Sequence, residues 1–190
     1  MDSMDDTYLN QLADRLAEQG IDLAPGLSVA EVEAVESTWA FRFPPDLRKL
    51  LTFMLPVSSR FPDWRRPDSD AIRDQLTWPA DGLCFDIEHN DFWIDAWGKK
   101  PQALEAACAI ARRAVAEAPP LIPIYGHRYL PADPPVEGNP VFSVYQTDII
   151  YYGFDLPSYL AAEFGVPNPY PLPESTREVR FWSELERLNC

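Results

Sequence analysis

The chain has 190 residues, 46% of them hydrophobic and 13% aromatic, which suffices for one sizeable core but not for two. Its formal net charge of -14 repels the phosphates of nucleic acids and of anionic lipids, so we expect no nucleic-acid or membrane partner, whereas a basic protein partner is electrostatically compatible. Cys84, Cys108 and Cys190 are too widely spaced for a zinc motif or a disulfide framework, so we expect no metal and no cofactor. No apolar run reaches the roughly 20 residues that span a bilayer, so we expect a cytoplasmic protein.

Three helices are predicted near the start of the chain. Gly20 follows the first of them as a stop signal. Ser28 and Glu31 form a Ser-x-x-Glu capping box ahead of the second, and Pro45 suits the first turn of the third because its missing N–H would have no intrahelical partner there. Apolar residues at three- and four-residue spacing place these helices at 5–19, 29–39 and 46–54.

A proline-rich loop follows at 56–68, with the sequence PVSSRFPDWRRPD. Trp64 and Arg65 in this loop are residue types that anchor protein interfaces. Two interpretations remain open: a binding loop, or a tryptophan folded back over the edge of the sheet. A short helix is then predicted at 71–76, ending before the next Trp-Pro pair.

The apolar period changes to two after Gly82, which predicts strands at 83–87 and 92–97 joined as a β-hairpin. A metal or acid-base site and a solvated hairpin turn are alternative interpretations of the acidic residues here. Their spacing matches no specific metal motif, and strand alternation would put two of them, Asp86 and Glu88, on the outer face. The cluster consists of Asp86, Glu88, His89, Asp91 and Asp95.

The centre of the sheet is predicted between residues 121 and 152. An Ala-rich helix at 102–117 precedes it. Two apolar runs rich in β-branched and aromatic residues, 121–130 and 141–152, then flank a connection that contains prolines and a glycine. This pattern is typical of two strands joined by a loop.

Three polar residues lie on these two runs: His127, Arg128 and Asp148. A buried carboxylate is costly unless it is paired, so we predict that Asp148 is buried and paired with His127 or Arg128. A structural polar network is one interpretation of this set, and a catalytic pair of His127 and Asp148 is the other. No nucleophile elbow, Gly-rich phosphate loop or Walker-type lysine accompanies them, so we expect no enzymatic activity.

The end of the chain combines a proline-rich connector at 165–175 with an amphipathic helix at 176–188 that starts at a second Ser-x-x-Glu box. A helix that carries both a phenylalanine and a tryptophan is expected to dock on its own domain or on a partner. We predict that it docks back and hides Trp182. The domain proper then covers 1–164, with 165–190 attached to it.

Five segments follow one another along the chain: LSVAEVEAVESTWAFRFPPDLRKLL, FDIEHNDFWIDAWGKKP, LIPIYGHRYLP, GNPVFSVYQTDIIYYG and DLPSYLAAEF. Their order resembles the SUKH superfamily, which includes the yeast cell-wall assembly regulator and many bacterial toxin-immunity proteins. The resemblance covers residues 27–164 and excludes the C-terminal helix. It implies an α+β fold with a mainly antiparallel sheet covered by helices, and protein binding as the function, without a shared catalytic constellation.

We therefore expect a non-catalytic protein-binding module, most specifically an immunity protein that neutralises a toxin domain with a basic surface. A regulatory scaffold that joins signalling partners is the alternative. The acidic charge would steer a cationic partner, and specificity would come from a few aromatic and basic anchors on exposed loops. The predicted anchors are Trp64, Arg65, His127, Arg128, Tyr129 and Tyr151.

Overall fold

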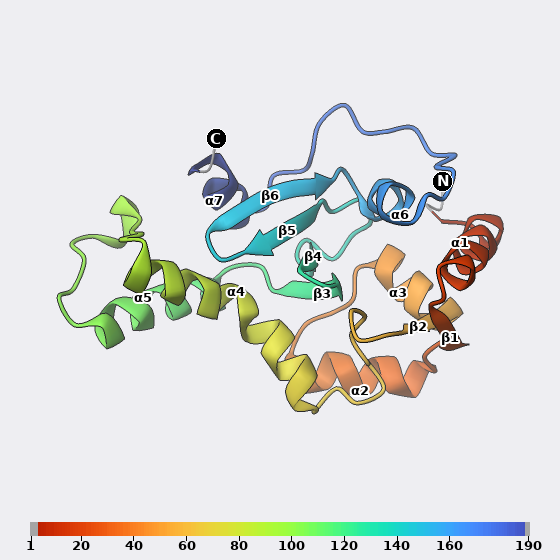
Figure 1. Ribbon diagram of the computed structural model, residues 1–190, viewed down its shortest axis with the longest axis horizontal. Helices are drawn as coiled ribbons and strands as arrows, with labels where there is room; N and C mark the ends of the chain where they lie inside the picture. Colours follow the sequence, from red (N-terminus) through yellow and green to blue (C-terminus); the bar gives the residue numbers. More distant parts are fainter. Residues whose placement is uncertain (1–3, 189–190) are drawn as a thin grey trace.

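The computed structural model describes residues 4–188 and has the predicted α+β class (Figure 1). Within that range it contains seven α-helices, one short 3-10 helix and two antiparallel sheets. Cys84 and Cys108 are buried free thiols, and Cys190 lies outside the described residues.

Three helices and a two-stranded sheet form the N-terminal part of the protein. The predicted positions of all three helices are confirmed, because local signals fix their starts. The Ser28 hydroxyl accepts the N–H of Glu31 while the Glu31 carboxylate accepts the N–H of Ser28, and Pro45 occupies the first turn of its helix. The elements are α1 (Asp6–Glu18), β1 (Asp22–Pro25), α2 (Val29–Trp39), α3 (Pro45–Phe53) and β2 (Met54–Val57), with β1 and β2 paired antiparallel.

The predicted β-hairpin at 83–87 and 92–97 is wrong. Residues 83–87 belong to a 20-residue helix that begins after its N-cap Ser69 and also contains the short helix predicted at 71–76. The second predicted strand is a loop that ends in a 3-10 helix. The elements are α4 (Asp70–His89), the 3-10 helix η1 (Asp95–Trp97) and α5 (Leu104–Glu117), and α4 and α5 pack together (Figure 1).

The error has a simple geometric cause. Leu83 and Ile87 are four residues apart, so they share one face of a helix as well as one face of a strand. Both are buried in α4. Phe85 distinguishes the two patterns, because a strand would place it beside them, and it is 45% exposed.

The main sheet lies where the sequence predicts the centre of the sheet. Each of the two predicted strands is itself an antiparallel hairpin, and the strands follow one another in the order β3-β4-β5-β6. Gly126 and Gln146 lie in the two tight turns with positive φ angles of 57° and 58°. The strands are β3 (Leu121–Tyr125), β4 (Arg128–Pro131), β5 (Val141–Tyr145) and β6 (Asp148–Gly153).

Pro79 lies inside α4 without ending the helix. A proline has no N–H, so the carbonyl of Gln75, four residues earlier, has no helical partner. The hydroxyl of Tyr129 on β4 donates a hydrogen bond to this carbonyl, with an O···O distance of 2.8 Å. The sheet therefore supplies the hydrogen bond that the proline removes from the helix.

The C-terminal part contributes α6 (Leu156–Phe164) and α7 (Trp182–Leu188). The last helix starts at Trp182, several residues after the predicted Ser-x-x-Glu box. Docking of this helix is confirmed: Trp182 is 1% exposed, its indole N–H donates to the carbonyl of Pro119 at 2.7 Å, and α7 packs against β6.

The four-stranded sheet is shared by two apolar clusters. Alternation along its strands places Ile122 and Leu130 in a cluster with α1, α2, α3 and α6, and Leu121 and Tyr129 in a cluster with α4, α5 and α7. Helices from both halves of the chain therefore pack on the sheet, and the C-terminal helix belongs to the second cluster.

Candidate functional site

Two of the predicted loop anchors have structural roles instead. Trp64 is 1% exposed and packs edge-to-face against Phe43, with ring centroids 5.3 Å apart. The Arg65 guanidinium binds the Glu31 carboxylate at 3.1 Å and the carbonyl of Pro25 at 2.5 Å. The loop is thus fastened to α2, and the interpretation of Trp64 as a surface anchor is wrong.

Tyr129 and Tyr151 are not exposed anchors either. Tyr129 is 1% exposed and bonded to α4, as described above. Tyr151 points toward α7, where its hydroxyl donates to the hydroxyl of Ser183 at 2.5 Å, and its ring stacks on Phe142. Tyr152, the next residue along the strand, faces the other way and is 40% exposed.

The prediction that Asp148 is buried and paired is also wrong. Asp148 is exposed at the start of β6, while Ile149 beside it is fully buried. The tight turn at Gln146 sets this register, because one residue more or less in the turn would exchange the two faces of the strand. Among residues 4–188 no hydrogen bond or ion pair joins Asp148 to His127, so the geometry brings no catalytic pair together.

Arg128 is the member of the predicted polar network that the fold holds in place. Its guanidinium donates to the Ser143 hydroxyl at 2.8 Å, lies 3.6 Å from the centroid of the Tyr152 ring, and has Nε 4.0 Å from the Glu163 carboxylate. The arginine therefore connects β4, β5, β6 and α6, and Ser143 and Glu163 take the place predicted for Asp148.

One face of the β5–β6 hairpin is exposed and aromatic. Tyr145, Ile150 and Tyr152 are 53%, 41% and 40% exposed. Ser143 lies opposite Ile150 in one ladder and opposite Arg128 in the other, so it shares this face. We call the surface formed by Arg128, Ser143, Tyr145, Ile150 and Tyr152 the open strand face.

A pocket of about 350 Å³ adjoins this face at the turn between β3 and β4. Tyr145 links the two, because its ring centroid lies 6.0 Å from those of both His127 and Trp78. Trp78 is fixed by its indole N–H, which donates to the carbonyl of Val144 at 3.0 Å. We call it the turn pocket; it is lined by Ser59, Arg60, Asp74, Gln75, Trp78, Gly126, His127 and Tyr129.

Two arginine side chains lie beside His127 at the turn pocket. The pKa of His127 is lowered by partial burial and then by the guanidinium groups of Arg128 and Arg60, and only Glu163 raises it. The imidazole is therefore neutral at pH 7.

Asp86, a member of the acidic cluster near the end of α4, has a structural role. Asp86, expected on an outer face, is 3% exposed and accepts hydrogen bonds from the Thr147 N–H at 2.8 Å, the Thr147 hydroxyl at 2.6 Å and the Asn90 amide at 2.5 Å. These bonds join α4 to the β5–β6 turn. Within residues 4–188, no group of three or more acidic, histidine or cysteine side chains has an arrangement that could hold a metal ion.

Cys84 and Cys108 lie close together between α4 and α5. Each sulfur lies near the other residue's carbonyl oxygen, at 3.8 Å for Cys84 and 3.9 Å for Cys108. Burial raises the pKa of the Cys84 thiol to about 12, so the thiolate that would act as a nucleophile is scarce at neutral pH.

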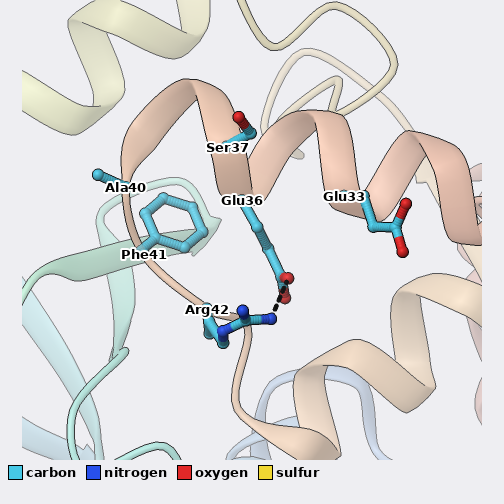
Figure 2. A pocket seen from close by; sticks show the side chains of 6 residues that line it. All are labelled: Glu33, Glu36, Ser37, Ala40, Phe41 and Arg42. Carbon is cyan, nitrogen blue, oxygen red and sulfur yellow. Dashed lines mark hydrogen bonds and ion pairs between the residues drawn. The ribbon is translucent and has the colours of Figure 1, made fainter.

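A second hollow, of about 570 Å³, lies at the C-terminal end of α2, and two of its charged residues, Glu36 and Arg42, are paired with each other (Figure 2). Figure 2 shows the Glu36 side chain pointing toward Arg42, with an oxygen–nitrogen distance of 3.4 Å. Glu36 also accepts the N–H of Phe43 at 3.1 Å and lies 3.8 Å from Arg48. Because these bonds hold the turn after α2, we assign this hollow a structural role.

The predicted anchors leave out most of the exposed site residues: Trp78, Tyr145, Ile150 and Tyr152. A signal existed only for the tyrosines, since strand alternation allows just one of Tyr151 and Tyr152 to face a partner. Trp78 looked like a helix end because a proline follows it. Arg60 comes from a loop more than 60 residues before the β3–β4 turn that it contacts, and nothing local indicates that contact.

Comparison with known proteins gives no match to any protein-family model, curated protein or solved structure. Among the described residues, no helix is both long and apolar enough to cross a membrane.

Proposed function

We propose that this protein is a non-catalytic protein-binding module whose partner docks on the open strand face. The supporting observation is the exposure of Tyr145, Ile150 and Tyr152 around a guanidinium that is already held in place. Tyrosine and arginine are enriched among the residues that dominate binding energy. The Arg128 side chain is already ordered, so docking loses little of its conformational entropy.

The partner should carry a basic surface. With a net charge of -14, the protein attracts a cationic surface before short-range contacts form. Exposed tyrosine rings can also accept lysine or arginine side chains through cation–π contacts. Association should therefore slow as salt is added, while the dissociation rate should depend mainly on the aromatic contacts.

The resemblance to the SUKH superfamily supports a more specific role as an immunity protein that neutralises a bacterial toxin in the cytoplasm. In that role the acidic module would cover a cationic surface of the toxin. A regulatory scaffold would use the same face for several weaker partners.

A capture experiment with matched variants tests the proposal. Wild-type protein, a Tyr145→Ala/Ile150→Thr variant and a Phe85→Ala control are immobilised and exposed at low salt to an extract of the native cell. Phe85 is an aromatic residue on α4 that is 45% exposed and is not part of the open strand face. Wild type and the control should retain the same basic protein. The double variant should bind it about 30-fold or more weakly, because the loss of a hot-spot residue costs about 2 kcal/mol or more.

The captured protein then distinguishes the two roles. If it arrests growth when produced alone and not when produced with this chain, the immunity role holds. Several weak, non-toxic partners would favour the scaffold. Equal retention of every protein by wild type and the double variant would refute docking on the open strand face.

A further inference from the structure

The turn pocket combines a fixed, unpaired cation with an apolar wall. Arg60 has no carboxylate within 4.0 Å of its side-chain nitrogens among residues 4–188, although the chain contains 30 acidic residues. Asp74 also lines the pocket, but it is exposed on α4 and forms no ion pair with Arg60.

Three features of the β3–β4 turn hold the Arg60 guanidinium in position. Its carbon lies 4.0 Å from the centroid of the Tyr125 ring, in a cation–π contact. The carbonyl of Arg60 accepts the N–H of Gly126 at 2.7 Å. A Cβ at residue 126 would lie 3.1 Å from a terminal nitrogen of Arg60, so a glycine there leaves room for the side chain. The cation is therefore positioned before any ligand arrives.

The other walls of the turn pocket complement a peptide rather than a bare ion. Trp78 is 42% exposed and offers an apolar surface to an aliphatic side-chain stem. Gln75 and Tyr129 form part of the wall beside Trp78.

We propose that the turn pocket binds the carboxylate of an aspartate or glutamate side chain on the partner, with Arg60 as its counterion and Trp78 against the stem of that side chain. The inference rests on the proposed function, because the open strand face would hold the surrounding partner surface. At this one contact, a cation of the acidic protein would bind an acidic side chain of the basic partner. A generic basic protein attracted by the net charge would lack the matching acid, so this contact adds specificity.

Binding of a capped amino acid tests the pocket without the partner. The probe is N-acetyl glutamate N-methylamide, and its neutral match is the glutamine analogue. Both are titrated at 0.15 M salt, where the Debye length is about 8 Å, so that the net charge of the protein is screened. The readouts are the NMR signals of the Trp78 indole N–H and the His127 ring. The glutamate probe should shift both signals saturably, bind at least tenfold more tightly than the glutamine probe, and raise the pKa of His127.

Two variants assign the effect to one side chain. Arg60→Gln should weaken the glutamate probe about tenfold or more, whereas Arg66→Gln, which changes an exposed arginine in the same loop, should leave its affinity unchanged. Equal binding of the two probes, or unchanged affinity in Arg60→Gln, would overturn the pocket assignment.

The captured partner separates this inference from the proposed function. A partner that loses affinity for the Tyr145→Ala/Ile150→Thr variant but binds Arg60→Gln like wild type would overturn the pocket assignment alone. If instead the glutamate probe binds through Arg60 and the partner is unaffected by changes in the open strand face, the pocket assignment is supported. Docking on the open strand face is then refuted.

Discussion

Replacement of Tyr129 by phenylalanine tests how the sheet compensates for Pro79. The substitution keeps the buried ring and removes the hydroxyl that donates to the carbonyl of Gln75, from an O···O distance of 2.8 Å. Because Tyr129 is 1% exposed, bulk water has little access from that side. A buried acceptor left without a donor costs about 1 to 3 kcal/mol, so Tyr129→Phe should lower the free energy of unfolding by about 2 kcal/mol. For a domain of this size the melting temperature should fall by about 4 to 8 °C.

A double-mutant cycle identifies the cause of this loss. In a Pro79→Ala background, the new N–H of residue 79 can donate to the Gln75 carbonyl as in an ordinary helix. The same Tyr129→Phe change should then cost less than about 1 kcal/mol, which gives a coupling free energy of about 1 kcal/mol or more.

The assay is urea denaturation of wild type, both single variants and the double variant, with the slope m checked for constancy. Tyr145→Phe is the matched control, because it removes the hydroxyl of a tyrosine that is 53% exposed and should change stability by less than about 0.5 kcal/mol. If Tyr129→Phe costs the same with proline or alanine at position 79, the hydroxyl does not compensate for the proline and the reasoning fails.

Two further predictions concern carboxylates. Asp86→Ala should destabilise the fold by about 3 kcal/mol, because its three donors on Thr147 and Asn90 lose a charged acceptor. Asp148→Ala, at the exposed end of β6, should change stability by less than about 0.5 kcal/mol. Equal urea midpoints for these two variants would contradict this prediction. Burial raises the pKa of Asp46 to about 6, from 3.8, so between about pH 4 and 6 the folded protein holds a proton that the unfolded chain has released. The contribution of Asp46 to stability is therefore complete below about pH 4 and is lost as the pH rises through about 6, by about 3 kcal/mol in all. The difference in unfolding free energy between wild type and Asp46→Asn should fall as the pH rises from about 4 to 6, and should stay constant from pH 7 to 8. If this difference does not change between pH 4 and 6, Asp46 ionises normally and the prediction fails.

Local signals in the sequence determined the N-terminal helices and the position of the main sheet. Ser28, Glu31 and Pro45 act within one helical turn of their own backbone, so their effect does not depend on the rest of the fold. The apolar runs between 121 and 153 are rich in β-branched and aromatic residues and are interrupted by turn residues, which favours strands in any context. The α+β class follows from these segments.

Only the tertiary structure decided between patterns that fit two structures equally well. The spacing of Leu83 and Ile87 suits a strand or a helix, and packing of α4 against α5 selects the helix. Pro79 is tolerated in this helix because the hydroxyl of Tyr129, on the sheet, donates to the carbonyl of Gln75. The register of the β5–β6 hairpin decides that Tyr152 rather than Tyr151 faces outward and that Asp148 is exposed. Arg60 and His127 are neighbours because the carbonyl of Arg60 accepts the N–H of Gly126, in the turn that also holds His127. Each of these outcomes depends on contacts between residues distant in the chain, and a spacing pattern within one segment carries no information about them.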